Sequence, residues 1–239
     1  DDDFDCDPDT DFSRDKPPML VEKHPILFVG AGPGDPELIT VKGQRALAAA
    51  DAVLYTGSLV PEALLQWARP EARRESSAGM DLAAIVAFMR EAWDQGLRVV
   101  RLHTGDPSLY GAIFEQMAAL DELGIGYRVI PGVTAAMAAA AALNLEFTLP
   151  EVSQTLILTR LEGRTPVPPG ERLEDLAAHG ASLAIYLSAG LAPRVGAVLR
   201  EAYGDEAPCA VVCRASQPDQ RILHTTAARL AAALQRRLG

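Results

Sequence analysis

Four short segments combine glycine and proline with hydroxyl, imidazole or carboxylate side chains, and each follows an apolar run that predicts a β-strand. They occupy residues 30–35, 55–58, 103–108 and 131–134. In parallel α/β sheets, ligands bind beyond the carboxyl ends of the strands. The four segments therefore predict one ligand-binding rim. A glycine–aspartate–proline turn can also serve only to reverse the chain, so the inference depends on several such segments lying together.

The most polar of these segments is 103–108. Gly105 allows the backbone to pass close to a ligand, and its amides can meet a carboxylate or an adenosine hydroxyl. Asp106, on what should be an exposed loop end, can accept a hydrogen bond from a hydroxyl or an ammonium group. His103 and Asp106 are the weak candidates for a catalytic role, because both can move protons, and the sequence does not identify a general base.

The segment 30–35 looks like a nucleotide-binding loop but departs from the dinucleotide pattern. That pattern requires a third glycine where this chain has Asp35, whose carboxylate would repel a pyrophosphate. Pro33 also lacks the backbone N–H that a phosphate cradle would use. The loop is therefore expected to form a turn and a pocket wall. A nicotinamide-dependent oxidoreductase remains a disfavoured alternative, which a nicotinamide titration would test.

The cysteines and histidines predict no metal site, because their spacing matches no common ligand pattern. Cys209 and Cys213 lie four residues apart in a predicted strand, on one face. Four strand residues span roughly 13 Å, which is too far for a disulfide. This spacing favours a reducing compartment, and we expect a cytoplasmic protein.

The charge is unevenly distributed along the 239 residues. The net charge is −10, and residues 1–16 contain eight Asp against Arg14 and Lys16, which leaves −4 for the rest. Dense like charge with few apolar residues predicts a disordered acidic tail over 1–24. The acidic opening is unlike a signal peptide, and no apolar run is long enough for a membrane span. The absence of any basic run argues against a nucleic-acid partner.

Predicted strands and helices alternate after the tail. Such alternation indicates a parallel sheet with helices on both faces, hence an α/β fold. The break at 131–132 divides it into two α/β domains, 25–133 and 134–239, with an interdomain cleft; one continuous sheet is the alternative. The expected strands are 26–29, 52–55, 98–103, 127–130, 156–159, 183–187, 210–212 and 220–224. The expected helices are 37–50, one beginning at 61, 81–95, 110–123, 134–143, 172–179, 191–202 and 226–238.

Three of these motifs together resemble a known family. They are 29–36 (Val-Gly-Ala-Gly-Pro-Gly-Asp-Pro), 105–107 (Gly-Asp-Pro) and 131–134 (Pro-Gly-Val-Thr). They are similar to those of the tetrapyrrole methylases, which are class III S-adenosylmethionine-dependent methyltransferases with two α/β domains and a cleft. The resemblance covers about residues 25–239. It implies a methyl transfer that releases S-adenosylhomocysteine, and a homodimer.

Further motifs resemble one branch of the family, whose members methylate carbon 11 of precorrin-4 to give precorrin-5, or of its cobalt counterpart, in cobalamin biosynthesis. They are 55–60 (Tyr-Thr-Gly-Ser-Leu-Val), 149–155 (Leu-Pro-Glu-Val-Ser-Gln-Thr), 159–160 (Thr-Arg) and 163–168 (Gly-Arg-Thr-Pro-Val-Pro). No pattern reports whether the macrocycle already carries cobalt. A protein that binds the tetrapyrrole or S-adenosylmethionine without catalysis is the other alternative.

The resemblance also implies which residues line the site. The donor pocket would contain Pro33, Gly105, Asp106, Leu109, Thr134, Ala135, Leu187, Ala210 and Thr225, with Tyr186 beside them. The substrate carries many carboxylates, and an acidic protein must meet them with local cations, for which arginine is well suited. The candidates for this contact are Arg101, Arg160, Arg164 and Lys42.

Overall fold

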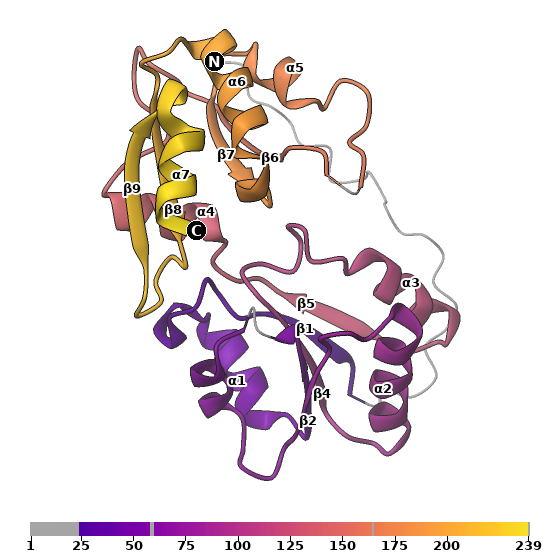
Figure 1. Cartoon of the computed structure of the whole chain (residues 1–239). Helices are drawn as coiled ribbons and strands as arrows, with labels where there is room; N and C mark the ends of the chain where they lie inside the picture. Colours follow the sequence, from indigo (N-terminus) through magenta and orange to yellow (C-terminus); the bar gives the residue numbers. More distant parts are fainter. Residues whose placement is uncertain (1–23, 58–59, 164, 239) are drawn as a thin grey trace, which may run out of the picture.

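The computed structural model describes residues 24–57, 60–163 and 165–238, which form two halves joined near residue 131 (Figure 1). All five strands before that point belong to one parallel sheet, and the four strands after it form two separate two-stranded sheets. The α/β fold is therefore confirmed, and the alternative of one continuous sheet is wrong. The domain boundary between 133 and 134 stays a prediction. The predicted acidic tail lies outside the described residues, except for His24.

The sheet of the first half has the strand order β3-β2-β4-β1-β5, with all neighbours parallel. Its central strands are buried on both faces, which is why their sequences are nearly continuous apolar runs. The elements are β1 (Ile26–Gly30), α1 (Val41–Ala49), β2 (Ala52–Tyr55), β3 (Arg73–Ser76), α2 (Leu82–Asp94), β4 (Val99–His103), α3 (Phe114–Glu122) and β5 (Tyr127–Ile130), with 3₁₀ turns at Pro36–Leu38 and Glu62–Trp67.

Helices cover both faces of this sheet. Leu47 of α1 and Leu64 of the second 3₁₀ turn pack with Val29 and Val100 on one face. Met89 of α2 and Leu120 of α3 pack with Phe28 on the other face. Because alternate strand residues point to opposite faces, each central strand supplies both cores and is fixed in register by both.

The second half places two small sheets around its helices (Figure 1). Strands β6 and β7 are parallel, and β8 and β9 form an antiparallel hairpin, as the sequence allowed for its last strand. Val195 of α6 and Leu230 of α7 pack together in the core of this half. The elements are α4 (Ala135–Leu143), β6 (Leu156–Arg160), α5 (Leu173–Ala177), β7 (Ser182–Tyr186), α6 (Ala192–Tyr203), β8 (Pro208–Cys213), β9 (Arg221–Thr226) and α7 (Leu230–Leu238), with 3₁₀ turns at Ala189–Leu191 and Ala227–Arg229.

Two predicted helices begin later than expected. The helix predicted over 37–50 is interrupted, because Thr40 is extended and its hydroxyl caps α1 by accepting from the Gly43 amide at 3.1 Å. The helix predicted from 110 starts only at Phe114, because Tyr110 and Ala112 have left-handed backbones, with φ of 56° and 49°. In both cases a local backbone conformation overrides a favourable helical composition.

Strand β3 is an element that the sequence pattern missed. Its residues are Arg-Arg-Glu-Ser and are mostly exposed, so it lacks the apolar run that identifies a strand. It lies at the edge of the sheet and pairs with β2, where charged side chains discourage pairing with a further chain. None of the helices in the described residues combines the length and the apolar character needed to span a membrane.

Three glycines bring the carboxyl ends of β1, β4 and β5 into contact. A Cβ atom on Gly30 would lie 2.6 Å from the Gly132 Cα and 2.7 Å from the Gly105 carbonyl oxygen. A Cβ atom on Gly132 would collide with the same Gly105 oxygen and with the Gly30 backbone. The three strand ends can therefore lie together only without side chains at Gly30 and Gly132.

We predict that Gly30→Ala destabilises the protein by about 1–3 kcal/mol, the usual cost of overpacking a dense interior, because backbone atoms rather than flexible side chains must move. The matched control is Gly190→Ala, since a Cβ atom at Gly190 has no atom within 4 Å and its backbone is not left-handed. Chemical denaturation of both variants measures the difference. Equal free energies of unfolding would contradict the close packing described above.

Candidate active site between the two halves

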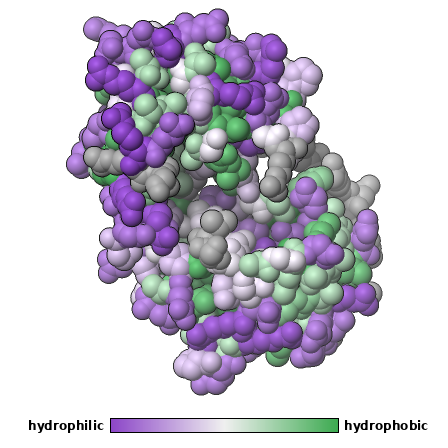
Figure 2. Space-filling model, viewed as in Figure 1, coloured by the Kyte–Doolittle hydropathy of each residue, from purple (hydrophilic) through white to green (hydrophobic). Residues whose placement is uncertain are grey.

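Three of the four predicted rim segments, 30–35, 103–108 and 131–134, lie in contact, whereas the fourth, 55–58, includes Ser58, which lies outside the described residues. The amide of Ala31 donates to the His103 carbonyl oxygen at 2.7 Å, and Gly105 and Gly32 exchange two backbone hydrogen bonds at 2.8 and 3.2 Å. These bonds extend the pairing of β1 and β4 past the ends of the strands. Figure 2 shows the molecule hollowed between its two halves, so the rim borders a cleft.

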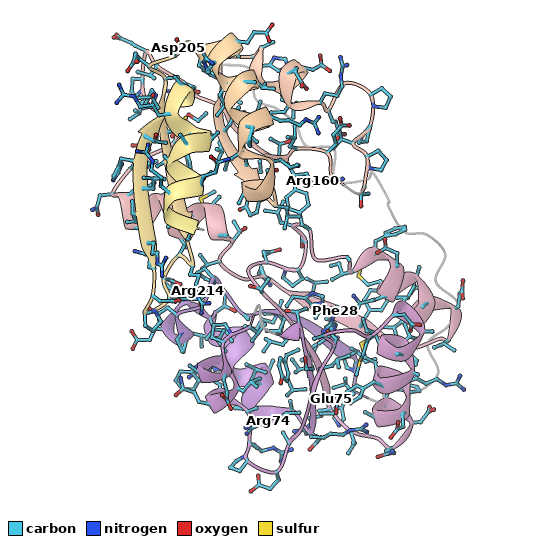
Figure 3. All side chains as sticks on the ribbon, viewed as in Figure 1. Phe28, Arg74, Glu75, Arg160, Asp205 and Arg214 are labelled. Carbon is cyan, nitrogen blue, oxygen red and sulfur yellow. The ribbon has the colours of Figure 1, made fainter. Side chains whose placement is uncertain are left out.

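The tip of the β8–β9 hairpin contacts the glycine loop across this cleft. The Asp35 amide donates to the Ser216 hydroxyl at 3.0 Å, and Gln217 Nε2 donates to the Pro33 carbonyl oxygen at 3.3 Å. The Gln217 side chain occupies the space that a Cβ atom on Gly34 would need. Figure 3 shows Arg214 of the hairpin tip at the junction of the halves. The hairpin tip therefore holds the glycine loop in place, and the role of this loop as a pocket wall stays a prediction.

Asp106 braces two loops of the rim. Its Oδ1 accepts from the Ser108 amide at 2.8 Å, and its Oδ2 accepts from the Gly132 amide at 2.9 Å. The second bond ties the loop after β4 to the loop after β5. Each oxygen thus already accepts from one backbone amide, and an ionised carboxylate can accept further bonds, so donor binding by Asp106 stays a prediction.

Arg101 and His103 lie in the interior, on the face of the sheet that α2 and α3 cover. Arg101 is 3% exposed and donates to Gln116 Oε1 and to the Leu54 carbonyl oxygen, at 3.1 and 3.3 Å. His103 is 2% exposed and stacks on Phe28, with ring centroids 5.9 Å apart. Burial, and then the charge of Arg101, lower the pKa of His103 to about 3, so the ring is neutral at physiological pH.

The structure does not support the roles that the sequence suggested for these two residues. Arg101 was expected to bind a substrate carboxylate and His103 was weighed as a catalytic group. Both occupy positions on a central strand whose side chains alternate between the two buried faces. The alternation turns them toward the helices and away from the cleft. The buried His103 Nε2 has no hydrogen-bond partner among the described residues.

Two tyrosines meet across the cleft. The rings of Tyr110, from the loop after β4, and Tyr186, at the end of β7, have centroids 5.5 Å apart. The Tyr186 hydroxyl accepts from the Ala136 amide at 2.9 Å and pairs with the Thr134 hydroxyl at 2.8 Å. Tyr186 therefore caps the N-terminus of α4, a task that the Thr134 side chain leaves undone. The sequence suggested Tyr186 but missed Tyr110, whose only signal was its place beside Gly111.

Arg160 is the predicted cation that the structure places at the cleft (Figure 3). It ends β6 opposite Tyr186, and its charge acts on the nearby Tyr110. Its Nη1 and Nη2 donate to the carbonyl oxygens of Thr165 and Pro166, both at 3.0 Å. It has no carboxylate partner within the described part of the chain, so its charge is available to an anion.

The structure says less about the other two residues that were predicted to bind substrate carboxylates, Lys42 and Arg164. Lys42 is exposed in the first turn of α1, next to the Thr40 cap. Arg164 lies outside the described residues.

Several of the remaining predicted donor residues are apolar, and their contact with a donor stays a prediction. Leu187 is 77% exposed although apolar, and its φ of 53° is strained for a side chain of this kind. Such exposure and strain concentrate at functional sites. Ala135 is also exposed, and Leu109 and Thr134 are half-buried. Ala210 and Thr225 pair with His224 and Cys209, so their side chains lie on opposite faces of the hairpin, and only one of them can face a given pocket.

No group of three His, Cys, Asp or Glu side chains in the described ranges is arranged to hold a metal ion. Cys209 and Cys213 are both free, as their spacing along β8 predicted.

Comparison with known proteins identifies the family. The model of the tetrapyrrole (corrin/porphyrin) methylases matches residues 25–231. The chain belongs to this family. The resemblance inferred from the glycine-rich motifs is thus confirmed, and the match begins at the residue where the acidic tail was predicted to end.

Two named relatives of this tetrapyrrole methylase are C(11)-methyltransferases. It is 51% identical over 202 residues to the cobalt-precorrin-4 C(11)-methyltransferase of Methanocaldococcus jannaschii, covering 84% of this chain and 78% of that protein. It is 52% identical over 201 residues to the precorrin-4 C(11)-methyltransferase of Pseudomonas aeruginosa, covering 84% and 80%.

Solved structures agree with these relatives. A cobalt-precorrin-4 methyltransferase superimposes on this methylase with a TM-score of 0.86 at 46% identity, covering 88% of this chain and 89% of the other. Uroporphyrin-III C-methyltransferase from Thermus thermophilus, complexed with S-adenosylhomocysteine, has a TM-score of 0.72 at 27% identity, covering 87% and 86%.

We predict that Asp106→Ala destabilises this methylase by about 1–3 kcal/mol, because two backbone amides lose a charged acceptor. The control is Asp94→Ala, which removes an exposed partner of Arg90 and should change stability by less than about 0.5 kcal/mol. Urea denaturation measures both. Equal stability of the two variants would show that the brace between the loops is unimportant.

His103 should make the stability of the protein depend on pH. Its pKa is about 3 in the folded state and about 6.5 in the unfolded chain, so only the unfolded chain takes up a proton between these values. The contribution of His103 is therefore complete above pH 6.5 and declines as the pH falls toward 3. Between pH 7 and pH 5 we expect a loss of about 2 kcal/mol.

The measurement is denaturation at several pH values in wild type, in His103→Leu and in the exposed control His24→Gln. The decline should be smaller in His103→Leu alone. Parallel curves for all three proteins would contradict the prediction.

Proposed function

We propose that this tetrapyrrole methylase transfers a methyl group from S-adenosylmethionine to carbon 11 of precorrin-4, with cobalt-precorrin-4 as the alternative substrate, in the biosynthesis of cobalamin. The observation that carries the proposal is the similarity to two relatives named for this reaction, each about half identical over 84% of the chain. The cleft described above supports it, because it offers an apolar lining beside an available arginine.

The residues of the cleft fit S-adenosylmethionine. Gly105 has a left-handed backbone, and the nearest atom that its missing side chain would meet is the Thr134 Cα at 3.8 Å, which leaves room for a ligand atom beside the backbone, while its amide stays bonded to the Gly32 carbonyl oxygen. The exposed apolar side chains of Ala135 and Leu187 suit an adenosyl group, which is largely flat and weakly polar. A related structure that contains S-adenosylhomocysteine supports the same donor.

The chain's own contribution to the reaction is mainly positional. S-adenosylmethionine supplies a methyl group on a sulfonium, which is a good leaving group. The two halves have to hold this donor and the ring carbon of the macrocycle in line, and alignment of this kind lowers a barrier by roughly 7–11 kcal/mol. The bonds through Asp106 and through the hairpin tip fix the loops that would carry out this alignment. A proton-transfer role is not assigned to His103, which faces the core.

We further propose a homodimer and a cytoplasmic location, as the resemblance and the unpaired cysteines suggest. Cross-linking or light scattering tests the first, and localisation of the tagged protein tests the second.

The decisive experiment incubates the protein with S-adenosylmethionine and, separately, metal-free and cobalt-containing precorrin-4. Mass spectrometry should show the gain of one methyl group, and comparison of the two substrates identifies the natural one. Calorimetry should show one donor site per chain. Binding of both ligands without a methylated product would favour the non-catalytic carrier, and failure to bind the donor would overturn the proposal.

Arg160 should bind a carboxylate of the tetrapyrrole. A charge-assisted hydrogen bond is worth about 1.5–3 kcal/mol, so Arg160→Ala should raise the KM for the tetrapyrrole roughly ten- to hundredfold. The effect should shrink at high salt, where screening weakens the wild-type contact. Arg160→Lys should restore only part of it, because an ammonium cannot make a two-pronged bond. Arg164, which belongs to the same stretch of family motifs, is expected to behave in the same way.

The matched control is Arg200→Ala, which removes an exposed arginine paired with Asp205, far from the cleft (Figure 3). It should leave KM unchanged. Donor affinity should be unchanged in all the arginine variants. If Arg160→Ala also behaves like wild type, Arg160 supports only the loop at Thr165 and Pro166.

A further inference from the structure

A buried arginine in the first half is connected to the wall of the cleft through one glutamine. Gln116, on α3, is itself 3% exposed. Its amide oxygen accepts from Arg101 Nε at 3.1 Å, and its amide nitrogen donates to the Ala112 carbonyl oxygen at 2.8 Å. Both ends of one side-chain amide are thus used, and they join a central strand to the loop that precedes α3.

The Arg101 end of this connection is a fixed point. Its guanidinium lies among residues that exclude water, with the Leu54 carbonyl oxygen as its other acceptor. No carboxylate in the described ranges neutralises it. Burial lowers the pKa of Arg101 to about 10, which still leaves it charged at neutral pH. A buried cation needs every acceptor it has, so the oxygen of Gln116 is strongly held.

The Ala112 end belongs to a turn whose backbone conformation is intrinsically unfavourable. Tyr110 and Ala112 both have left-handed backbones, which are unfavourable for residues with side chains. Between them, Gly111 lies so close to the Pro107 carbonyl that no side chain would fit. Strained conformations of this kind persist only where the surroundings enforce them. The bond from Gln116 is the side-chain hydrogen bond that the structure gives to this turn.

The turn carries Tyr110 to the cleft. Tyr110 is 42% exposed and meets Tyr186, which caps α4 and lies opposite Arg160 on the neighbouring strand. The orientation of the Tyr110 ring therefore depends on a backbone that is anchored from the interior of the first half.

We propose that Gln116 is a positioning residue: held by Arg101, it fixes the strained turn over 110–112 and so places Tyr110 against Tyr186 as a wall for the tetrapyrrole. The proposal rests on the function proposed above. It assigns to Gln116 no contact with substrate or donor.

The substitution Gln116→Glu separates this role from a merely structural one. A carboxylate keeps the acceptor for Arg101 and adds an ion pair with it, but it cannot donate to the Ala112 carbonyl oxygen. We expect the melting temperature to stay the same or rise. Hydrogen exchange of the amides in 108–113 should become at least about tenfold faster, since a lost hydrogen bond to a buried acceptor has this order of effect. The KM for the tetrapyrrole should rise by a similar factor, with little change in donor affinity.

Two further variants make the test specific. Gln235→Glu introduces the same charge on the exposed surface of α7 and should change neither exchange nor KM. In Tyr110→Ala, the KM should already be raised, and adding Gln116→Glu should raise it no further, because both changes act through the same ring. Tyr110→Phe keeps the ring and should keep the wild-type KM.

The outcomes are decisive. Wild-type exchange over 108–113 and a wild-type KM in Gln116→Glu would overturn the proposal, as would additive effects in the double variant. Loss of the fold in Gln116→Glu would also overturn it, because the proposal requires Arg101 to form an ion pair with the new carboxylate. If wild-type protein fails to methylate the tetrapyrrole, the proposed function fails, and the exchange measurement then decides the positioning of the turn by itself.

Discussion

Backbone meets backbone where β1, β4 and β5 end, and no side chain fits between them. Gly30 and Gly132 satisfy this constraint, because a Cβ atom on either would collide with the Gly105 carbonyl oxygen. Their contact brings the loops after three strands within hydrogen-bonding distance of one another, which allows the Asp106 carboxylate to reach the Gly132 amide and Gly32 to pair with Gly105. The cleft wall of the first half is therefore a consequence of two missing side chains more than of any one polar residue.

Much of the architecture could be predicted from the sequence because the central strands are apolar on both faces. A run such as 26–29 is hard to place except as a buried strand, and the alternation with helices then requires a parallel sheet. The departures have local causes. Thr40 caps α1, which begins at Val41, four residues after the expected start at 37, and the left-handed turn before Phe114 delays α3. Strand β3 carries charges suited to a sheet edge, so no apolar pattern identifies it.

The site was predicted less completely, because residue type does not reveal which way a side chain points. Asp106, Arg101 and His103 have the chemistry of a binding site, yet the structure directs the first to backbone amides and the other two into the core. Arg160 and Tyr186 reach the cleft because their strands end there. Tyr110 and Gln217 could not be found from the sequence, since each depends on a contact between segments that lie far apart along the chain.

The hairpin tip that touches the glycine loop has a consequence for the order in which the protein can acquire its shape. The hydrogen bond from Asp35 to Ser216 joins residues 181 positions apart. During synthesis, the first half emerges early and can form its sheet, but this wall of its cleft is completed only after the β8–β9 hairpin has been translated. A nascent chain would thus display an open, partly apolar rim from the folding of its first half until the hairpin has emerged and docked on the glycine loop.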